Sequence, residues 1–254
     1  MEISEKSSTF APAMRNLPTV TKAFLLANLG MWFLDVLLQK YDIQLHTFLG
    51  LHYVTGANFH FWQPLTYMFM HSGFSHLFFN MFAVLMFGPV LEQEWGGKRY
   101  LIYYIICGLG AAFIQECVWA IKIQSLLTTY SAESVMLNYA NMVVTIGASG
   151  AVFGILLAFG WLFPDVPMYL FFIPIPIKAR WMVIGYAGIE LFAGFSPLQG
   201  DNIAHFAHLG GMLFGLIVLL WWKYKDPLLQ KWFPSRHSTD RDHNYSGYHY
   251  RRRL

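Results

Sequence analysis

Residues 147–163 read GASGAVFGILLAFGWLF, and residues 205–222 read HFAHLGGMLFGLIVLLWW. Both stretches are apolar enough for a helix in lipid, yet one carries Ser149 near its beginning and the other contains His208. An ionisable side chain within a membrane span is costly and by default marks a functional site. A nucleophile type and a base type on two such spans predict acyl-transfer chemistry inside the bilayer.

The composition of the chain is that of an integral membrane protein. Of its 254 residues, 56% are hydrophobic and only 12% are charged, whereas a soluble domain carries about 25% charged residues. A helix needs about 20 apolar residues to cross a bilayer. The six spans that we expect are residues 21–39, 72–93, 99–120, 148–164, 181–197 and 203–222. They predict an all-α bundle at residues 21–222, between a polar leader (1–20) and a polar, basic tail (223–254).

The distribution of lysine and arginine predicts how the spans are oriented. With six spans both termini lie on one side, and 15 of the 17 basic residues fall on that side. The positive-inside rule therefore predicts a cytoplasmic leader and tail, with the long loops 40–71 and 121–147 outside. The net charge of +3 comes mostly from the tail, so it does not indicate a nucleic-acid partner.

Helix geometry predicts that the serine and the histidine lie at a similar depth. If span 148–164 ends at the inner boundary, Ser149 lies about 8 Å below the outer boundary of a core about 30 Å thick. Span 203–222 starts from outside, so His208 lies about 9 Å inward. Two independent estimates thus agree, although agreement in depth does not by itself place the two side chains in contact.

Glycines accompany both side chains. Gly147 and Gly150 permit the sharp turn and the close backbone approach that a chain entering the bundle needs. A serine at a helix N-terminus also meets free amides, which stabilise an oxyanion. Small-residue motifs, which let membrane helices approach closely, lie on both spans. They are Gly150-x-x-x-Gly154 and Gly211-x-x-x-Gly215.

A third pair of polar residues lies on span 72–93. His76 and Asn80 are four residues apart and therefore share one face of the helix. Both side chains can donate hydrogen bonds. They are candidate oxyanion donors if that face meets Ser149.

The order and placement of these motifs resemble the rhomboid intramembrane serine proteases of the basic six-helix, prokaryotic type, over roughly residues 20–222. The resemblance implies that Ser149 is the nucleophile and His208 the general base, with no acidic third member. It implies an oxyanion site of His76, Asn80 and the Ser149 amide, and requires no metal and no cofactor. The first loop would lie partly in the outer leaflet, and the fifth span would be a mobile gate.

The resemblance also implies the biological setting. The substrates would be transmembrane segments of other membrane proteins, cut near the outer face, and the lipid bilayer is the other partner. The short soluble ends favour a bacterial inner membrane. The oligomeric state stays open.

Two positions depart from the pattern of many members. Gln63 follows Trp62 where they carry arginine, so arginine-based hydrogen bonds in the first loop are absent or replaced. Phe153 stands where they carry a tyrosine that stacks on the histidine, so stacking survives but the hydroxyl is lost. Glu92, four residues before Gly96, matches a structural feature at the inner end of the second span.

Other interpretations stay open at this point. One is a catalytically silent rhomboid-like protein that binds membrane-protein clients, although such relatives typically lack the serine or the histidine, and this chain keeps both. A haem or metal protein is a further alternative, with ligands from His71, His76, His205 and His208. His205 also competes with His208 for the role of base, but the glycine spacing fits His208. Glu190, in the middle of the fifth span, has a structural role or a part in gate motion.

Overall fold

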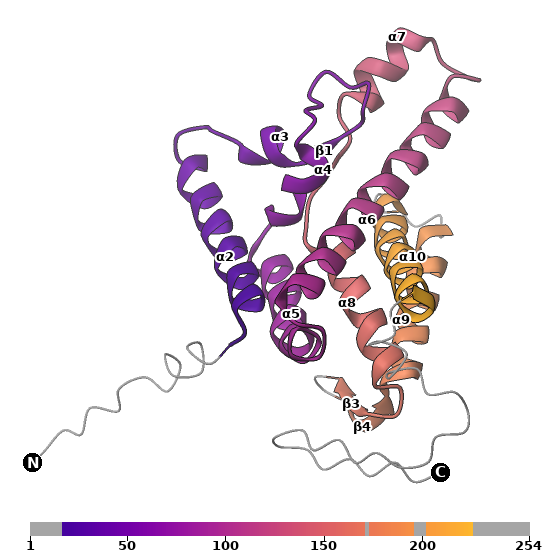
Figure 1. Cartoon of the computed structure of the whole chain (residues 1–254). Coiled ribbons are helices and arrows are strands. Elements are labelled where there is room, and N and C mark those ends of the chain that lie inside the picture. Colours follow the sequence, from indigo (N-terminus) through magenta and orange to yellow (C-terminus); the bar gives the residue numbers. More distant parts are fainter. Residues whose placement is uncertain (1–16, 171–172, 196–201, 226–254) are drawn as a thin grey trace, which may run out of the picture. The chain divides into compact units, whose positions relative to one another are not determined.

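The computed structural model describes residues 17–170, 173–195 and 202–225. Helices make up most of these residues (Figure 1). Most of the predicted leader (1–16) and nearly all of the predicted tail (226–254) lie outside the described residues.

Each predicted span has a helix in the structure. The helices are α2 (Thr19–Gln39), α5 (Phe74–Trp95), α6 (Gly97–Leu126), α8 (Ser149–Leu162), α9 (Ala179–Phe195) and α10 (Asn202–Lys225). Four of them, α2, α5, α6 and the His205–Lys225 part of α10, are long and apolar enough to cross a membrane, and α8 is a shorter apolar helix. Helix α6 is longer than the predicted span 99–120, and it continues to Leu126.

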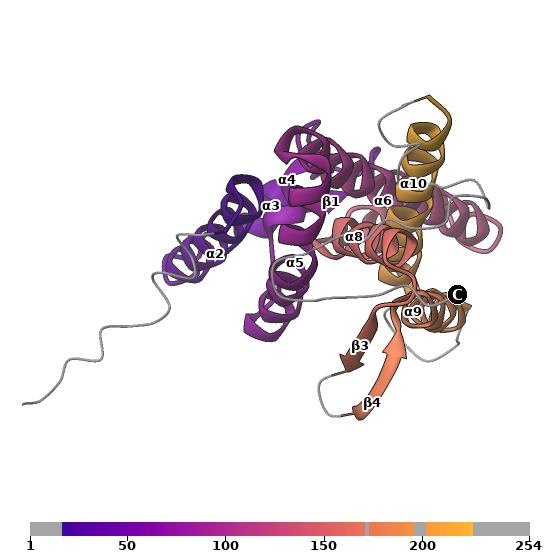
Figure 2. The ribbon, with the colours of Figure 1, turned by 60° about the horizontal axis from the view of Figure 1, so that its bottom comes forward.

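Helix α8 is the most enclosed of these elements. It packs against α5, α6 and α9, and it lies among them in Figure 2. Nine of its 14 residues are buried, which explains why it is apolar all round rather than on one stripe. The helix that begins with Ser149 is therefore surrounded by protein on several sides, although it is the shortest of the six.

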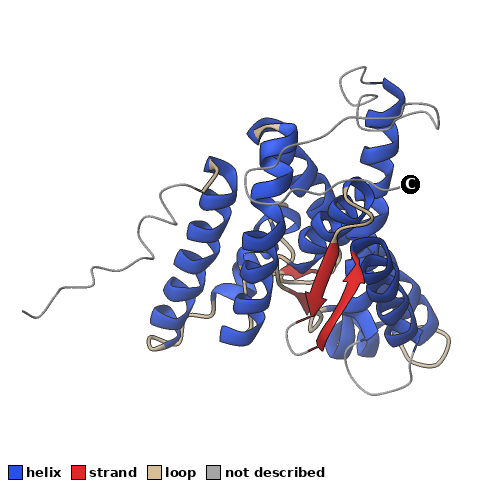
Figure 3. Cartoon of the chain, turned by 90° about the horizontal axis from the view of Figure 1, so that it is seen from below, coloured by secondary structure: helices blue, strands red, loops and turns tan. Residues whose placement is uncertain are grey.

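Short elements connect the helices, and a view coloured by secondary structure shows how few strands there are among the described residues (Figure 3). These short connecting elements, helices and strands together, are α3 (Leu45–Leu49), β1 (Leu51–His52), α4 (Gln63–Thr66), η1 (Tyr67–Phe69), α7 (Ala132–Val135), η2 (Met136–Ala140), β2 (Val144–Thr145), β3 (Pro167–Leu170) and β4 (Ile173–Lys178). The antiparallel pair of β3 and β4 was not predicted from the sequence, which indicated only a short loop. Asp165, just before it, forms ion pairs with Lys178 and Arg180.

The segment that leads into α8 is held by the first loop. Strand β2 pairs antiparallel with β1, in the register Leu51 to Thr145. Two residues further on, the Gly147 N–H donates to the Tyr67 carbonyl at 2.9 Å. Non-helical backbone at membrane depth needs protein partners for its polar groups. The protected approach to Ser149 that the sequence predicts is therefore present.

The side chain of Gln63 connects parts of the first loop by hydrogen bonds to their backbone. Its side chain is fully buried. The Gln63 Oε1 accepts from the His52 N–H at 3.2 Å, and its Nε2 donates to the Asn58 carbonyl at 2.8 Å. The hydrogen bonds that an arginine would make at this position are thus replaced rather than absent. Burial lowers the pKa of the neighbouring His52 imidazole, which keeps that ring neutral beside the strand.

Glu92 caps a helix far from it in the sequence. Its carboxylate accepts from the backbone N–H of Val20 at 2.8 Å, and from the N–H and hydroxyl of Thr21 at 2.7 and 2.8 Å. These N–H groups belong to the first turn of α2, where no intrahelical acceptor exists and the helix dipole favours a negative charge. The structural role that the resemblance implies for Glu92 is therefore a cap joining α5 to α2.

We expect Glu92→Ala to destabilise the protein by about 2 kcal/mol or more, because it leaves buried donors without their charged acceptor. Thermal unfolding in detergent micelles measures the effect. Glu94→Ala is the matched control, since Glu94 lies on the same helix and the cap of α2 does not involve it. Equal losses of stability in the two variants would contradict the capping role.

Candidate active site

The structure brings Ser149 and His208 into hydrogen-bond contact. The Ser149 Oγ and the His208 Nε2 lie 2.7 Å apart, although the two residues are 59 positions apart in the chain. Ser149 is the first residue of α8, and His208 lies in the second turn of α10. An imidazole nitrogen at this distance from a hydroxyl is the geometry of a general base and its nucleophile.

Close approach of two helix backbones makes this contact possible. A Cβ atom at Gly211 would collide with the Gly150 carbonyl, and one at Gly154 would lie 3.3 Å from the Gly211 carbonyl. Side chains at these positions would push α8 and α10 apart. Of the four predicted packing glycines, Gly211 therefore sets the approach of α10 to α8. Gly150 and Gly154 chiefly admit α6, because a Cβ atom at either would collide with Ala111 or Cys107 of that helix.

The fourth glycine packs elsewhere than predicted. A Cβ atom at Gly215 would meet the Tyr103 hydroxyl at 2.5 Å and the Cys107 Sγ at 3.1 Å, both on α6. Gly215 thus lets α10 approach α6 rather than α8.

Phe153 holds the face of the histidine ring. Its ring stacks on that of His208, with centroids 4.4 Å apart and planes inclined by only 10°. It lies four residues after Ser149, so both side chains leave the same side of α8. The stacking expected of phenylalanine at this position is present.

The turn before Ser149 requires glycine. Gly147 has a φ of 129°, in the region that residues with a Cβ rarely adopt. A Cβ there would also lie 2.7 Å from the His76 Nε2. The imidazole of His76 therefore sits directly against the nucleophile turn, while its Nδ1 lies 3.1 Å from the Ser72 hydroxyl.

Asn80 lies one turn below His76 and is buried. Its side-chain amide donates to the His76 carbonyl at 2.9 Å. An amide nitrogen carries two hydrogens, so this bond leaves a second N–H for another acceptor. The structure thus places His76 beside the Ser149 turn and uses part of Asn80 to brace the helix.

Glu190 is the residue whose place sequence reasoning missed. Its Oε2 lies 2.9 Å from the His208 Nδ1 and 2.6 Å from the His205 Nδ1. The resemblance implies no acidic third member, yet a carboxylate contacts the ring nitrogen opposite Ser149. The sequence shows a carboxylate in the middle of the fifth span, which indicates that Glu190 has a polar partner. It does not show that this partner lies on another helix. Both histidines contact Glu190, but the ring nitrogen 2.7 Å from the Ser149 Oγ is the Nε2 of His208, the histidine that the glycine spacing favours.

The four histidines of the metal alternative do not form one group. Among the described residues, the one set of three or more whose ligand atoms lie within 4.8 Å of one another is Glu190, His205 and His208. His71 packs its ring against that of His76 at 5.0 Å. Burial lowers the pKa of His71 to about 4, with a contribution from His76, so its ring is neutral at physiological pH.

Comparison with known proteins establishes the family. Residues 58–224 match the Rhomboid domain, and the chain therefore belongs to the rhomboid family. With its membrane-capable helices it is a multi-pass membrane protein.

Its relatives include bacterial and plant proteins. It is 29% identical over 220 residues to "Putative rhomboid protease YdcA" of Bacillus subtilis, covering 84% of this chain and 92% of that protein. It is 25% identical to "Rhomboid protease GlpG" of Haemophilus influenzae, over 67% of this chain and 72% of that protein. The match to "RHOMBOID-like protein 5" of Arabidopsis thaliana is 31% identical over 63% of this chain, which spans only 44% of that relative.

We expect Gly147→Ala to disrupt the site. A positive φ at a residue with a Cβ costs about 1–3 kcal/mol, and the added carbon would also displace His76. The rate of labelling of Ser149 by a serine-reactive fluorophosphonate should fall by about tenfold or more, which corresponds to 1.4 kcal/mol. Gly30→Ala is the control, because Gly30 lies within α2 with nothing within 4 Å of an added Cβ. Unchanged labelling of Gly147→Ala would show that the turn does not depend on glycine.

Proposed function

We propose that residues 21–222 form an intramembrane serine endopeptidase that cuts transmembrane segments of other membrane proteins with a Ser149–His208 dyad. The observation that carries the proposal is the 2.7 Å contact between the Ser149 Oγ and the His208 Nε2 on two apolar helices. Membership of the rhomboid family, and relatives that bear the word protease in their names, support the same reaction.

The reaction begins when His208 Nε2 takes the proton of the Ser149 hydroxyl as its oxygen attacks the scissile carbonyl carbon. The tetrahedral adduct collapses when the same proton passes to the leaving amine, which breaks the peptide bond. A water molecule, deprotonated by His208, then attacks the acyl-enzyme and releases the carboxyl product. Phe153 holds the imidazole ring in the plane that both steps use.

The negative oxygen of the adduct needs donors that are already in place. The Ser149 N–H is one of the amides at the beginning of α8 that lack an intrahelical acceptor. His76, packed against the Gly147 turn, and the second amide hydrogen of Asn80 would supply the others. All three donors belong to buried or partly buried residues, where a hydrogen bond to an anion is stronger than in water.

The substrate is a helix that has been locally unwound. In lipid every carbonyl of a helix is hydrogen-bonded and shielded, so a regular helix offers Ser149 no accessible bond. Helix α9 is the element past which a substrate would move. It carries large exposed apolar side chains on its surface, namely Trp181, Ile184, Ile189, Leu191, Phe192 and Phe195. Such a surface is suited to lipid and to another apolar helix.

The proposed topology has six spans with both ends in the cytoplasm. The loops that contain β1, β2 and α7 then face outward. The β3–β4 hairpin, which ends at Lys178, and Arg180 at the beginning of α9 face inward. The first loop exposes Tyr41, Phe48 and Phe61, which fits contact with the outer leaflet. The bacterial relative that this chain matches over 92% of its length favours a bacterial inner membrane.

The second candidate function is a silent client-binding protein of the same family. The residues oppose it, because both dyad members are present and in contact, and Gly147 and Phe153 also support them. A protein that only retains clients has no need of a hydrogen-bonded serine and histidine.

The first experiment is cleavage of a single-span reporter protein in liposomes by the wild type and by Ser149→Ala. We expect the wild type to cut near the outer end of the reporter helix. The variant should fall below detection, since loss of a catalytic serine costs about a millionfold in kcat. Absence of cleavage by folded wild type on several reporters would favour the client-binding function, and equal cleavage by both proteins would reveal another nucleophile.

Single cysteines test the topology. In a Cys107→Ala, Cys117→Ala background, a membrane-impermeant maleimide should label Tyr130→Cys in intact cells. It should label Lys178→Cys only after permeabilisation. Tyr130 and Lys178 are both exposed in the structure, so accessibility alone does not separate them. The reverse pattern would invert the proposed orientation.

A further inference from the structure

A carboxylate from a third helix meets the proposed dyad. Glu190 lies on α9, whereas Ser149 begins α8 and His208 lies on α10. The Glu190 Oε2 is 2.9 Å from the His208 Nδ1, and the Ser149 Oγ is 2.7 Å from the other nitrogen of the same ring. Serine, imidazole and carboxylate thus form one continuous hydrogen-bonded chain.

We propose that Glu190 is a positioning residue that orients His208, so that the site operates as Ser149–His208–Glu190. The inference rests on the proposed function, since it takes Ser149 as the nucleophile. It adds an acidic member, from the fifth helix, to a dyad for which the sequence indicated none.

The contact with Glu190 bears on the tautomer of His208. To accept the serine proton, Nε2 must carry a lone pair, so in the neutral ring the hydrogen resides on Nδ1. An Nδ1–H in a low-dielectric site needs an acceptor, and Glu190 Oε2 is that acceptor. The opposite tautomer would aim a lone pair at the carboxylate and is disfavoured. Glu190 therefore selects the form of His208 that can act as a base.

The carboxylate also acts on His208 through its charge. The Glu190 side chain is 11% exposed and that of His208 is 17% exposed, so water screens their interaction only weakly. When the proton moves from Ser149 to Nε2, the ring becomes an imidazolium and the Nδ1 hydrogen stays in place. Glu190 remains a carboxylate and stabilises the positive charge as it forms. Atoms and charges balance without any further reactant.

His205 fixes the carboxylate itself. Its Nδ1 lies 2.6 Å from the same Oε2 that contacts His208. Residues three apart on a helix are neighbours, so the two histidines of α10 hold the oxygen between them. His205, which the sequence offered as a rival base, is thus assigned to holding Glu190 in position.

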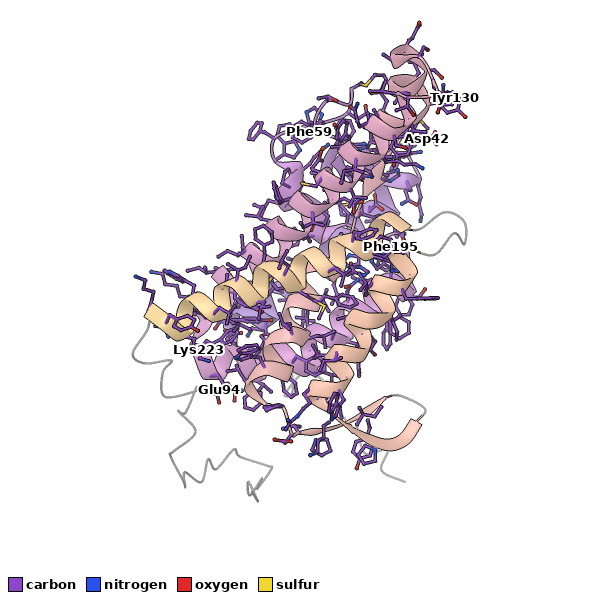
Figure 4. The ribbon with its side chains drawn as sticks, turned by 90° about the vertical axis from the view of Figure 1, so that its right-hand side faces the viewer. Asp42, Phe59, Glu94, Tyr130, Phe195 and Lys223 are labelled. Atoms are coloured by element: carbon purple, nitrogen blue, oxygen red, sulfur yellow. The ribbon has the colours of Figure 1, made fainter. Side chains whose placement is uncertain are left out.

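The arrangement links the packing of α9 to the chemistry. Helix α9 is held beside the dyad helices by an edge contact between Tyr186 and Phe153, and by one between Phe195 and Phe206. Figure 4 shows Phe195 at the end of α9, next to α10. Because Glu190 is carried by α9 alone, His208 has its acceptor only while α9 is packed in place.

The same three side chains are a possible set of metal ligands, since their ligand atoms lie within 4.8 Å of one another. The hydrogen bonds favour the positioning role. The Glu190 oxygen is 2.6 and 2.9 Å from the two nitrogens, whereas ligands about 2.0–2.1 Å from a tetrahedral zinc ion stand further apart. Metal binding is therefore one outcome of the test.

The test compares Glu190→Gln, Glu190→Asp and wild type in liposomes. The readouts are kcat and KM for the single-span reporter, the rate of fluorophosphonate labelling of Ser149, and thermal unfolding. We expect Glu190→Gln to lower kcat by about 10²- to 10⁴-fold with KM changed less than about threefold. Labelling should slow in parallel, because a small probe requires an activated serine but not the binding of a membrane helix. Glu190→Asp, which keeps the charge, should recover part of the loss.

Glu116→Gln is the matched control. Glu116 is a carboxylate on another apolar helix, α6, and it accepts a hydrogen bond from the Val54 N–H, away from the dyad. We expect its kcat and labelling rate to equal those of the wild type. A comparable loss in Glu116→Gln would mean that removing any intramembrane carboxylate harms the protein.

Three results would overturn the inference. Retention of most activity by Glu190→Gln would show that the carboxylate is dispensable. A raised KM with unchanged labelling would assign Glu190 to substrate access along α9. Loss of wild-type activity on chelation, restored by Zn²⁺, would make the cluster a metal site. Failure of the proposed function is distinct from all three, because wild type and Ser149→Ala would then label and cleave alike.

Discussion

Lipid offers no hydrogen-bonding partner, and this constraint organises the structure around Ser149. Irregular backbone can enter the apolar layer only where protein satisfies it. Strand β1 and the Tyr67 carbonyl do so for the segment before α8. The same constraint explains Gln63, whose buried amide satisfies both a strand N–H and a loop carbonyl. It also explains Glu92, whose carboxylate serves the first turn of α2.

Glycines allow the helices of this framework to approach closely enough to form the candidate site. A hydroxyl and an imidazole on different helices can touch only if the helix backbones come closer than larger side chains allow. Gly211 provides that approach between α10 and α8, and Gly150 and Gly154 provide the approach of α8 to α6. Gly147 then turns the chain with a positive φ and leaves room for His76. The absence of side chains at these glycines therefore allows the polar side chains of Ser149 and His208 to come into contact.

The helices were predictable because span length and apolar composition are properties of the sequence alone. All six predicted spans have a helix, and α6 merely continues six residues further than expected. The β3–β4 hairpin was missed, since the 16 residues between the predicted spans 148–164 and 181–197 read as a loop. Its alternation of isoleucine and proline over residues 173–177 was the available signal, because proline tolerates an edge strand.

The sequence by itself determined the family motifs and the apolar spans, and it indicated Ser149, His208, His76 and Asn80 as candidate site residues. Depth along a helix follows from counting residues, so even the common level of the serine and histidine could be anticipated. What only the tertiary structure decided is which faces meet. The rotation of α10 about its own axis places His208 against Ser149 and His205 against Glu190. The same rotation directs Gly215 toward α6. Such pairings depend on how several helices pack at once, and no periodicity within one span encodes the position of another.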